Sequence, residues 1–113
     1  MTFESLVEAL KDTEIPFAEG AWQDAHKLRQ DYGVYALDDA HDLMADDRHG
    51  ERLVEGTIDL FTLHSRGTEK AAQIEGALEF VGVIWRLNAG PMYENDTGYT
   101  HWEWVFDCLP PRG

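Results

Sequence analysis

The N-terminal part of the chain carries a helical pattern followed by an extended one. Thr2 is a suitable N-cap for a helix whose apolar side chains recur at the spacing of one helix face. Pro16 biases the preceding residue toward extended geometry, so the helix is expected to end by position 13 or 14. A short strand over residues 17–19 is expected next. The apolar helix face consists of Phe3, Leu6, Val7 and Leu10.

The following segment contains one clear strand pattern. Residues 32–37 contain aromatic and β-branched side chains and end at an acidic pair, which predicts a second strand. Residues 22–31 are polar and mixed in charge, which indicates a surface loop or a short helix. Residues 43–50 favour a hairpin, although residues 39–47 could also be drawn as one helix.

A long strand is predicted over residues 52–63, because apolar and polar side chains alternate along it. The side with Val54, Ile58 and Leu60 is expected to face the core. The opposite side is more polar and is expected to face outward. It carries Leu53, Glu55, Thr57, Asp59 and Phe61.

A second helix is predicted over residues 68–81. Thr68 is expected to be its N-cap, with Glu69 in the first turn to suit the helix dipole. Gly82 is placed for the left-handed residue that commonly ends a helix. The apolar face of this helix consists of Ala71, Ile74, Ala77, Leu78 and Val81.

Two strands that pair antiparallel are predicted after this helix. The first covers residues 83–88 and is expected to break at the Gly90–Pro91 pair. Residues 94–98 then form a turn into the last strand, residues 99–106, whose aromatic side chains alternate with polar ones. The expected core side of the last strand carries Thr100, Trp102, Trp104, Phe106 and Cys108.

These elements predict one α+β domain over residues 1–113. Its sheet is expected to be mostly antiparallel, with four to five strands, two flanking helices and the element order αβ(β)ββαββ. A chain of 113 residues that is 43% hydrophobic can bury a single core. The chain shows neither an apolar run of about 20 residues nor a signal-peptide pattern, so no membrane partner and a cytosolic location are expected.

The charge of the chain limits the partners that it can take. Asp and Glu number 22 against 9 Lys and Arg, which gives a net charge of −13. This balance works against specific nucleic-acid binding, because affinity for phosphates comes from basic side chains. It suits a basic protein partner, or a surface that DNA must pass without binding. Cys108 has no second cysteine to pair with and is expected to be a buried thiol.

The sequence contains no motif typical of catalysis or nucleotide binding. The acidic cluster over residues 38–49 offers carboxylate and imidazole groups, but its spacing fits neither a calcium loop nor a zinc-protease helix. A metal-dependent hydrolase at this cluster is the less favoured alternative.

His101 and Glu103 could form an acid–base pair, although exposed polar neighbours on a strand are far commoner. The tryptophans of the last two strands are expected to pack in the core. No enzyme activity, metal or cofactor is expected.

Several segments resemble small tail proteins of long-tailed bacteriophages and prophages, in particular the tail completion, or tail terminator, family. The resemblance lies in EGTIDLFT at residues 55–62, the helix over 68–81, WRL at 85–87 and YENDTGYTHWEW at 93–104. Tyr35 with the acidic stretch after it fits the same layout, as does the N-terminal helix. The resemblance therefore covers most of the chain.

The resemblance implies a non-enzymatic structural subunit. Its expected partners are further copies of itself in a hexameric ring, the tail-tube protein and the head-connector protein. The ring would end the tail tube and join it to the head, with DNA only as passing cargo. The implied location is the host cytoplasm during assembly and then the virion. No cofactor goes with this function.

Two groups of residues are candidate sites for assembly. An acidic segment is predicted to face the ring lumen or a partner, and the outward side of the last strand is predicted to contact a neighbouring subunit. The alternative function is an acidic DNA mimic or inhibitor that binds a basic partner; acids are expected on both strand faces, which favours the ring subunit. The acidic segment carries Asp38, Asp39, Asp42, Asp46 and Asp47, and the contact face carries Tyr99, His101 and Glu103.

Overall fold

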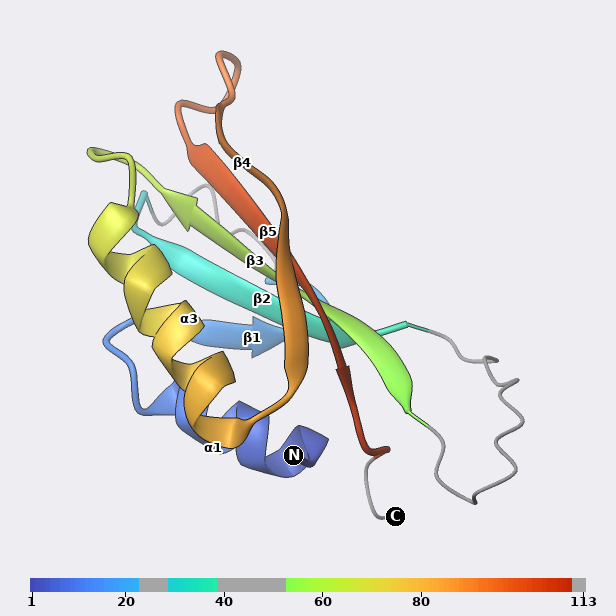
Figure 1. Cartoon of the computed structure of the whole chain (residues 1–113). Coiled ribbons are helices and arrows are strands. Elements are labelled where there is room, and N and C mark those ends of the chain that lie inside the picture. Colours follow the sequence, from blue (N-terminus) through green and yellow to red (C-terminus); the bar gives the residue numbers. More distant parts are fainter. Residues whose placement is uncertain (23–28, 39–52, 111–113) are drawn as a thin grey trace.

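Helices cover one face of a mixed sheet in the computed structural model, which describes residues 1–22, 29–38 and 53–110 (Figure 1). Both described helices lie on the same side of the sheet and contact each other (Figure 1). Neither of them is long and apolar enough to span a bilayer. In chain order the elements are α1 (Phe3–Lys11), β1 (Phe17–Glu19), β2 (Tyr32–Leu37), β3 (Val54–Thr62), α3 (Thr68–Val81), β4 (Ile84–Tyr93) and β5 (Thr100–Cys108).

The strand order within the described residues is β1-β2-β3-β5-β4. β1 runs parallel to β2, and the other neighbouring strands pair antiparallel, including β4 with β5 as predicted. The predicted α+β class with two flanking helices is therefore confirmed, and one parallel pair makes the sheet mixed. β4 lies at an edge, so only β5 pairs with it among the described strands.

Helix α1 follows its sequence pattern closely. Thr2 is the N-cap, and its Oγ1 accepts a hydrogen bond from the Ser5 backbone N–H at 3.1 Å. The helix ends at Lys11, just before the predicted limit. Leu6 and Leu10 are fully buried in the main core. The apolar face of α1 therefore packs as its spacing predicts.

Helix α3 begins differently from the prediction. Thr68 is the first helical residue rather than the N-cap, and no described side chain caps this end. Gly67 takes the N-cap position with φ 80°, and its carbonyl accepts the Ala71 N–H at 2.8 Å. A Cβ at Gly67 would lie 2.7 Å from the Thr62 side chain, so both the dihedral and the space require glycine here. At the other end, Gly82 has the predicted left-handed conformation, with φ 86°.

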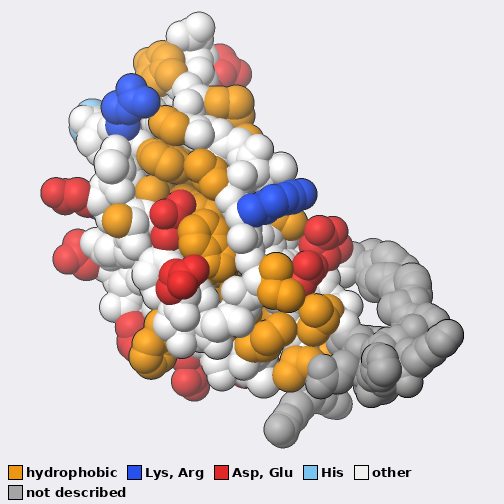
Figure 2. All heavy atoms as spheres, in the orientation of Figure 1, with side chains coloured by type: hydrophobic (Ala, Val, Ile, Leu, Met, Phe, Trp, Pro, Cys, Tyr) orange, Lys and Arg blue, Asp and Glu red, His pale blue; other side chains and the backbone are white. Residues whose placement is uncertain are grey.

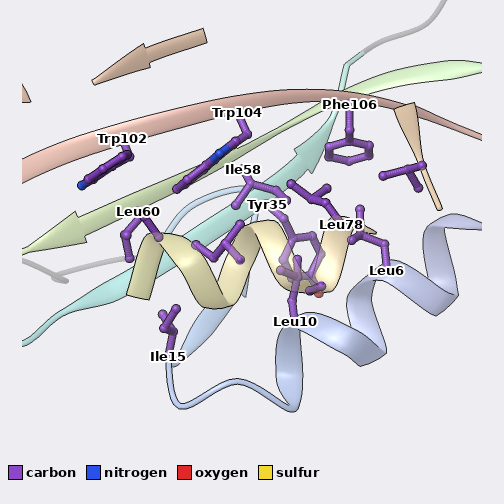
Figure 3. Close-up of a cluster of buried hydrophobic side chains, with 14 of the residues drawn as sticks. Leu6, Leu10, Ile15, Tyr35, Ile58, Leu60, Leu78, Trp102, Trp104 and Phe106 are labelled. Carbon is purple, nitrogen blue, oxygen red and sulfur yellow. The ribbon is translucent and has the colours of Figure 1, made fainter. Parts of the chain in front are cut away.

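The main core lies between the helices and the inner side of the sheet (Figure 3). Trp102, Trp104 and Phe106 project from β5 toward the helices (Figure 3), as the alternation predicts. The two indole rings stack with centroids 5.8 Å apart. Trp104 Nε1 donates to Glu75 Oε2 at 2.9 Å, and Trp102 Nε1 donates to the Arg66 carbonyl at 2.7 Å. Both tryptophans are therefore satisfied core residues.

Strand β4 is longer than predicted. It continues through Gly90–Pro91 to Tyr93, so the predicted break at this pair is wrong. Register shifts between Leu87 and Ala89 and between Ala89 and Met92 absorb the extra residues. An edge strand also tolerates proline, which has no backbone N–H. On the outer side of an edge strand, no neighbouring strand needs that hydrogen-bond donor. β4 therefore accompanies β5 along most of its length.

The alternation predicted for the two long strands is confirmed. Ile58 and Leu60 are buried on the inner side of β3, whereas Asp59 between them is partly exposed. Other predictions fall on residues that the structure does not describe. These are the hairpin at 43–50, its alternative helix at 39–47, and most of the polar segment at 22–31.

Candidate functional site

A polar network surrounds His101 on the open face of the sheet, the face without described helices. His101 Nε2 forms a hydrogen bond with Asp59 Oδ1 on β3 at 2.8 Å. His101 Nδ1 lies 3.6 Å from Glu94 Oε2 in the turn before β5. Phe61 stacks on the imidazole with ring centroids 4.4 Å apart. The ring therefore links β3 to the β4–β5 turn, and its partner is Asp59 rather than Glu103, the acid–base partner considered from the sequence.

The carboxylates around His101 favour its charged form. The hydrogen bond to Asp59 raises the pKa of His101 above its usual 6.5, burial opposes this, and the charges of Asp59, Glu94 and Glu103 add to it. A raised folded-state pKa means that the interaction stabilises the fold fully below pH about 6.5. That contribution is lost as the pH rises through the folded-state pKa.

Replacing His101 by glutamine is therefore expected to have a pH-dependent effect. At pH 6 the free energy of unfolding should fall by about 1.5–3 kcal/mol, the usual contribution of a hydrogen bond to a charged group. At pH 9 the difference from the wild type should be smaller, because this stabilisation is lost as the pH rises through the folded-state pKa. Urea unfolding at both pH values measures this difference. A loss that stays constant from pH 6 to pH 9 would contradict the assignment, and Glu69→Gln on the exposed start of α3 is the control.

Tyr99 does not lie on an exposed face, so the prediction that its side chain is free to meet a neighbour is wrong. The side chain is fully buried in a second hydrophobic cluster with Tyr32. Its hydroxyl donates to the Gln30 carbonyl at 3.0 Å, and its ring packs edge-on against Tyr32 with centroids 5.5 Å apart. Burial raises the pKa of the Tyr32 hydroxyl to about 12. The outward side of the sheet is therefore covered by packed aromatic rings at this end.

Four carboxylates form two cross-strand pairs on the open face. Glu55 on β3 lies opposite Asp107 on β5, and Asp59 lies opposite Glu103. Like charges directly opposite each other destabilise a sheet. The second pair is compensated, because Asp59 binds the histidine described above and Glu103 Oε1 accepts from Asn88 Nδ2 at 3.1 Å. Neither member of the first pair forms an ion pair with a described residue.

Exposed apolar side chains run along β4, and we term them the β4 strip. Figure 2 shows hydrophobic side chains gathered over this strand, with acidic side chains on both sides of them. Cross-strand partners share a face, so Leu87 opposite Trp104 lies on the helix side, and Ile84 opposite Asp107 lies on the open side. The β4 strip consists of Ile84, Leu87, Met92 and Tyr93, which are between 40% and 65% exposed.

The other predicted site residues have mixed outcomes. Asp38 is exposed at the end of β2, and its backbone N–H donates to the Glu55 carbonyl at 2.8 Å. Cys108 is fully buried, and burial raises the pKa of its thiol to about 11, which agrees with the predicted buried thiol. Among the described residues, no three His, Cys, Asp or Glu side chains are grouped to hold a metal ion. The remaining acidic candidates lie outside the described residues; these are Asp39, Asp42, Asp46 and Asp47.

Two of these features, the β4 strip and the carboxylate pairs, were not predicted from the sequence pattern. The β4 strip had one available signal: Ile84 and Trp85 are adjacent apolar residues, so a strand must turn one of them away from the core. The carboxylate pairs depend on the register of β3 against β5, which a sequence pattern does not give.

The expectation that strand acids occupy both faces is wrong for β3 and β5. Their acids share one face, because an even spacing along a strand keeps side chains on the same side.

The described geometry thus contains two distinctive surfaces. The network around His101 is polar and largely satisfied within the chain. The β4 strip is apolar, exposed and set on a sheet edge, so it has area left to bury against another molecule. No protein-family model and no curated protein sequence matches this chain significantly.

Proposed function

We propose that this domain is a non-enzymatic structural subunit of a phage or prophage tail, part of a ring that ends the tail tube and joins it to the head connector. The observation that carries the proposal is the β4 strip. Exposed apolar side chains on a strand edge that no described residue pairs with favour burial against another chain, and monomeric proteins usually protect such edges. A subunit that works only in an assembly has a use for this surface.

Further features support the same role. The resemblance to tail terminator proteins also implies a sheet flanked by helices, and the described residues form a five-stranded sheet with helices against it (Figure 1). The net charge of −13 suits the wall of a passage for DNA, since like charge keeps the phosphates from binding. The acidic segment that starts at Asp38 stays predicted to face the lumen or a partner. His101 and Glu103 stay predicted contacts to a neighbouring subunit.

The direct test mixes the purified protein with the tail-tube protein of the same phage. Electron microscopy and sedimentation velocity are expected to show hexameric rings seated on tube ends. The isolated protein can remain monomeric, because weak contacts between subunits become stable only when the tube end adds its own. A protein that stays monomeric in this mixture and never binds the tube end would contradict the proposal.

An acidic DNA mimic or inhibitor is the second candidate, and the carboxylate pairs are the observation that favours it. Glu55, Asp59, Glu103 and Asp107 form two rows on one sheet face, which a basic protein can bind in place of phosphates. This candidate leaves the exposed β4 strip without a role, so the assembly subunit is the preferred proposal. Competition with DNA for a basic DNA-binding protein, without any ring formation, would reverse that preference.

A further inference from the structure

We propose that the edge of β4 binds an extended segment of another protein in which apolar side chains alternate with lysine or arginine. This inference rests on the proposed assembly function for the source of that segment, and it adds the chemistry by which the segment is recognised. Three observations carry it. They are a strand edge with which no other described strand pairs, the apolar strip along that edge, and a pair of carboxylates that form no ion pair with a described residue.

The free edge supplies the hydrogen bonds. β4 pairs only with β5 among the described strands, so its other side presents backbone N–H and C=O groups to a further strand. Residues 84–87 pair with β5 in unbroken register, before the first shift near Ala89. This regular stretch is the part of the edge that can extend the sheet.

The carboxylates supply the charge selectivity. A hollow of about 240 Å³ opens at the start of β4 and is lined by Ile84, Val105, Glu55 and Asp107. A lysine or arginine side chain could lay its stem on the apolar wall while its cationic head reaches the carboxylates. Arg86 borders the hollow but forms no ion pair with a described residue. A basic side chain from a partner would relieve the repulsion between Glu55 and Asp107.

The two sides of the edge differ in what they offer. On the helix side, Glu75 and Glu79 already accept the indole N–H groups of Trp104 and Trp85, at 2.9 and 2.7 Å. Those carboxylates are therefore engaged within the chain, and the surface beside them is the exposed side chain of Leu87. The partner's apolar side chains are expected on this side, and its basic side chains on the open side. A strand in which apolar and basic residues alternate has this arrangement, because successive side chains point to opposite faces of a sheet.

A second copy of this chain fits the edge less well. Each copy carries a net charge of −13, and Arg86 is the only lysine or arginine on β4. Pairing two β4 edges would also bring the acidic neighbours on the two β5 strands closer together. Such like-charge contacts oppose association, whereas a basic segment is attracted. The edge is therefore assigned to a different protein, and contacts between ring subunits to other surfaces.

The test is an NMR titration of the labelled protein with a peptide of about ten residues, the length of β4, that alternates valine and lysine. We expect saturable binding with chemical-shift changes centred on residues 84–87. A peptide with glutamate in place of lysine should bind at least about tenfold more weakly. The double change Glu55→Gln with Asp107→Asn should weaken binding of the lysine peptide, while Glu4→Gln with Glu8→Gln on α1 should not.

Variants of the β4 strip test its apolar part. Leu87→Asn should lower the affinity for the lysine peptide by about tenfold, because the exposed apolar side chain on the helix side of the contact is lost while the charge stays the same. Phe80→Asn is the matched control, since Phe80 is 85% exposed and lies on α3, outside the strip. This control should leave the affinity unchanged. Circular dichroism verifies that both variants fold.

The outcomes separate this inference from the proposed function. Equal binding of the lysine and glutamate peptides, or no saturable binding, would overturn the inference. Shift changes on β4 that grow with protein concentration without peptide would assign the edge to a second copy and overturn it as well. Rings on tube ends without peptide binding would refute only this inference. Peptide binding without any ring or tube contact would refute only the assembly function.

Discussion

Replacing Trp104 by alanine is expected to lower the free energy of unfolding by about 3–5 kcal/mol, a large share of the stability of a domain this size. Trp104 is fully buried, and its ring stacks on Trp102. The change removes a large side chain and leaves a cavity that the neighbours fill only in part. It also deprives Glu75 of its indole donor. Urea unfolding followed by circular dichroism measures the loss.

Trp85→Ala is the matched control for this prediction. The indole of Trp85 donates to Glu79 at 2.7 Å, much as Trp104 donates to Glu75, but Trp85 lies on the edge strand and is only partly buried. Its loss should therefore cost less, about 1–2 kcal/mol. Equal losses in the free energy of unfolding for the two variants would contradict the placement of Trp104 in the core and of Trp85 at the sheet edge.

Gly90→Ala is expected to destabilise the domain by about 2–4 kcal/mol. Gly90 has φ 103°, a conformation that residues with a side chain rarely adopt. A Cβ at this position would lie 2.5 Å from the His101 carbonyl oxygen and 2.8 Å from the Trp102 Cα. Both are backbone atoms of β5, so the clash is relieved only by separating the two strands. Thermal unfolding measures the effect.

Gly76→Ala provides the comparison for the glycine prediction. Gly76 lies on the exposed side of α3, and a Cβ there meets no atom within 4 Å. Alanine favours a helix interior over glycine by up to about 1 kcal/mol, so this variant should be slightly more stable than the wild type. If Gly90→Ala were as well tolerated as Gly76→Ala, the path of β4 beside β5 through residue 90 would be wrong.

The parts of the fold that follow from local periodicity could be predicted from the sequence. The helix spacing of Leu6 and Leu10 identifies the buried face of α1, and the alternation through Trp102 and Trp104 identifies the inner side of β5. Each of these patterns has one physical cause, the repeat of a regular element against a single core. Glycine at the end of α3 is predictable in the same way, because position 82 needs a left-handed residue.

The candidate surfaces depend on contacts between segments that are distant in the sequence, and a local sequence pattern does not predict such contacts. The facing of Glu55 and Asp107 requires the register of β3 against β5. Tyr99 lies on the outward side by alternation, yet packing against Tyr32 buries it. The continuation of β4 through Pro91 depends on its place at the sheet edge. Edge position and register are properties of the whole sheet, so local patterns leave them open.

Hydrogen–deuterium exchange of the protein bound to tail tubes tests most directly the proposal that the domain assembles through the edge of β4. Within residues 84–87, the backbone amides that point away from β5 should exchange much more slowly in the assembly than in the free protein, because a partner strand then provides their hydrogen-bond acceptors. The amides of α1 serve as the internal reference and should exchange at the same rate in both states. Stable assemblies in which those amides of residues 84–87 exchange as fast as in the free protein would contradict the proposal.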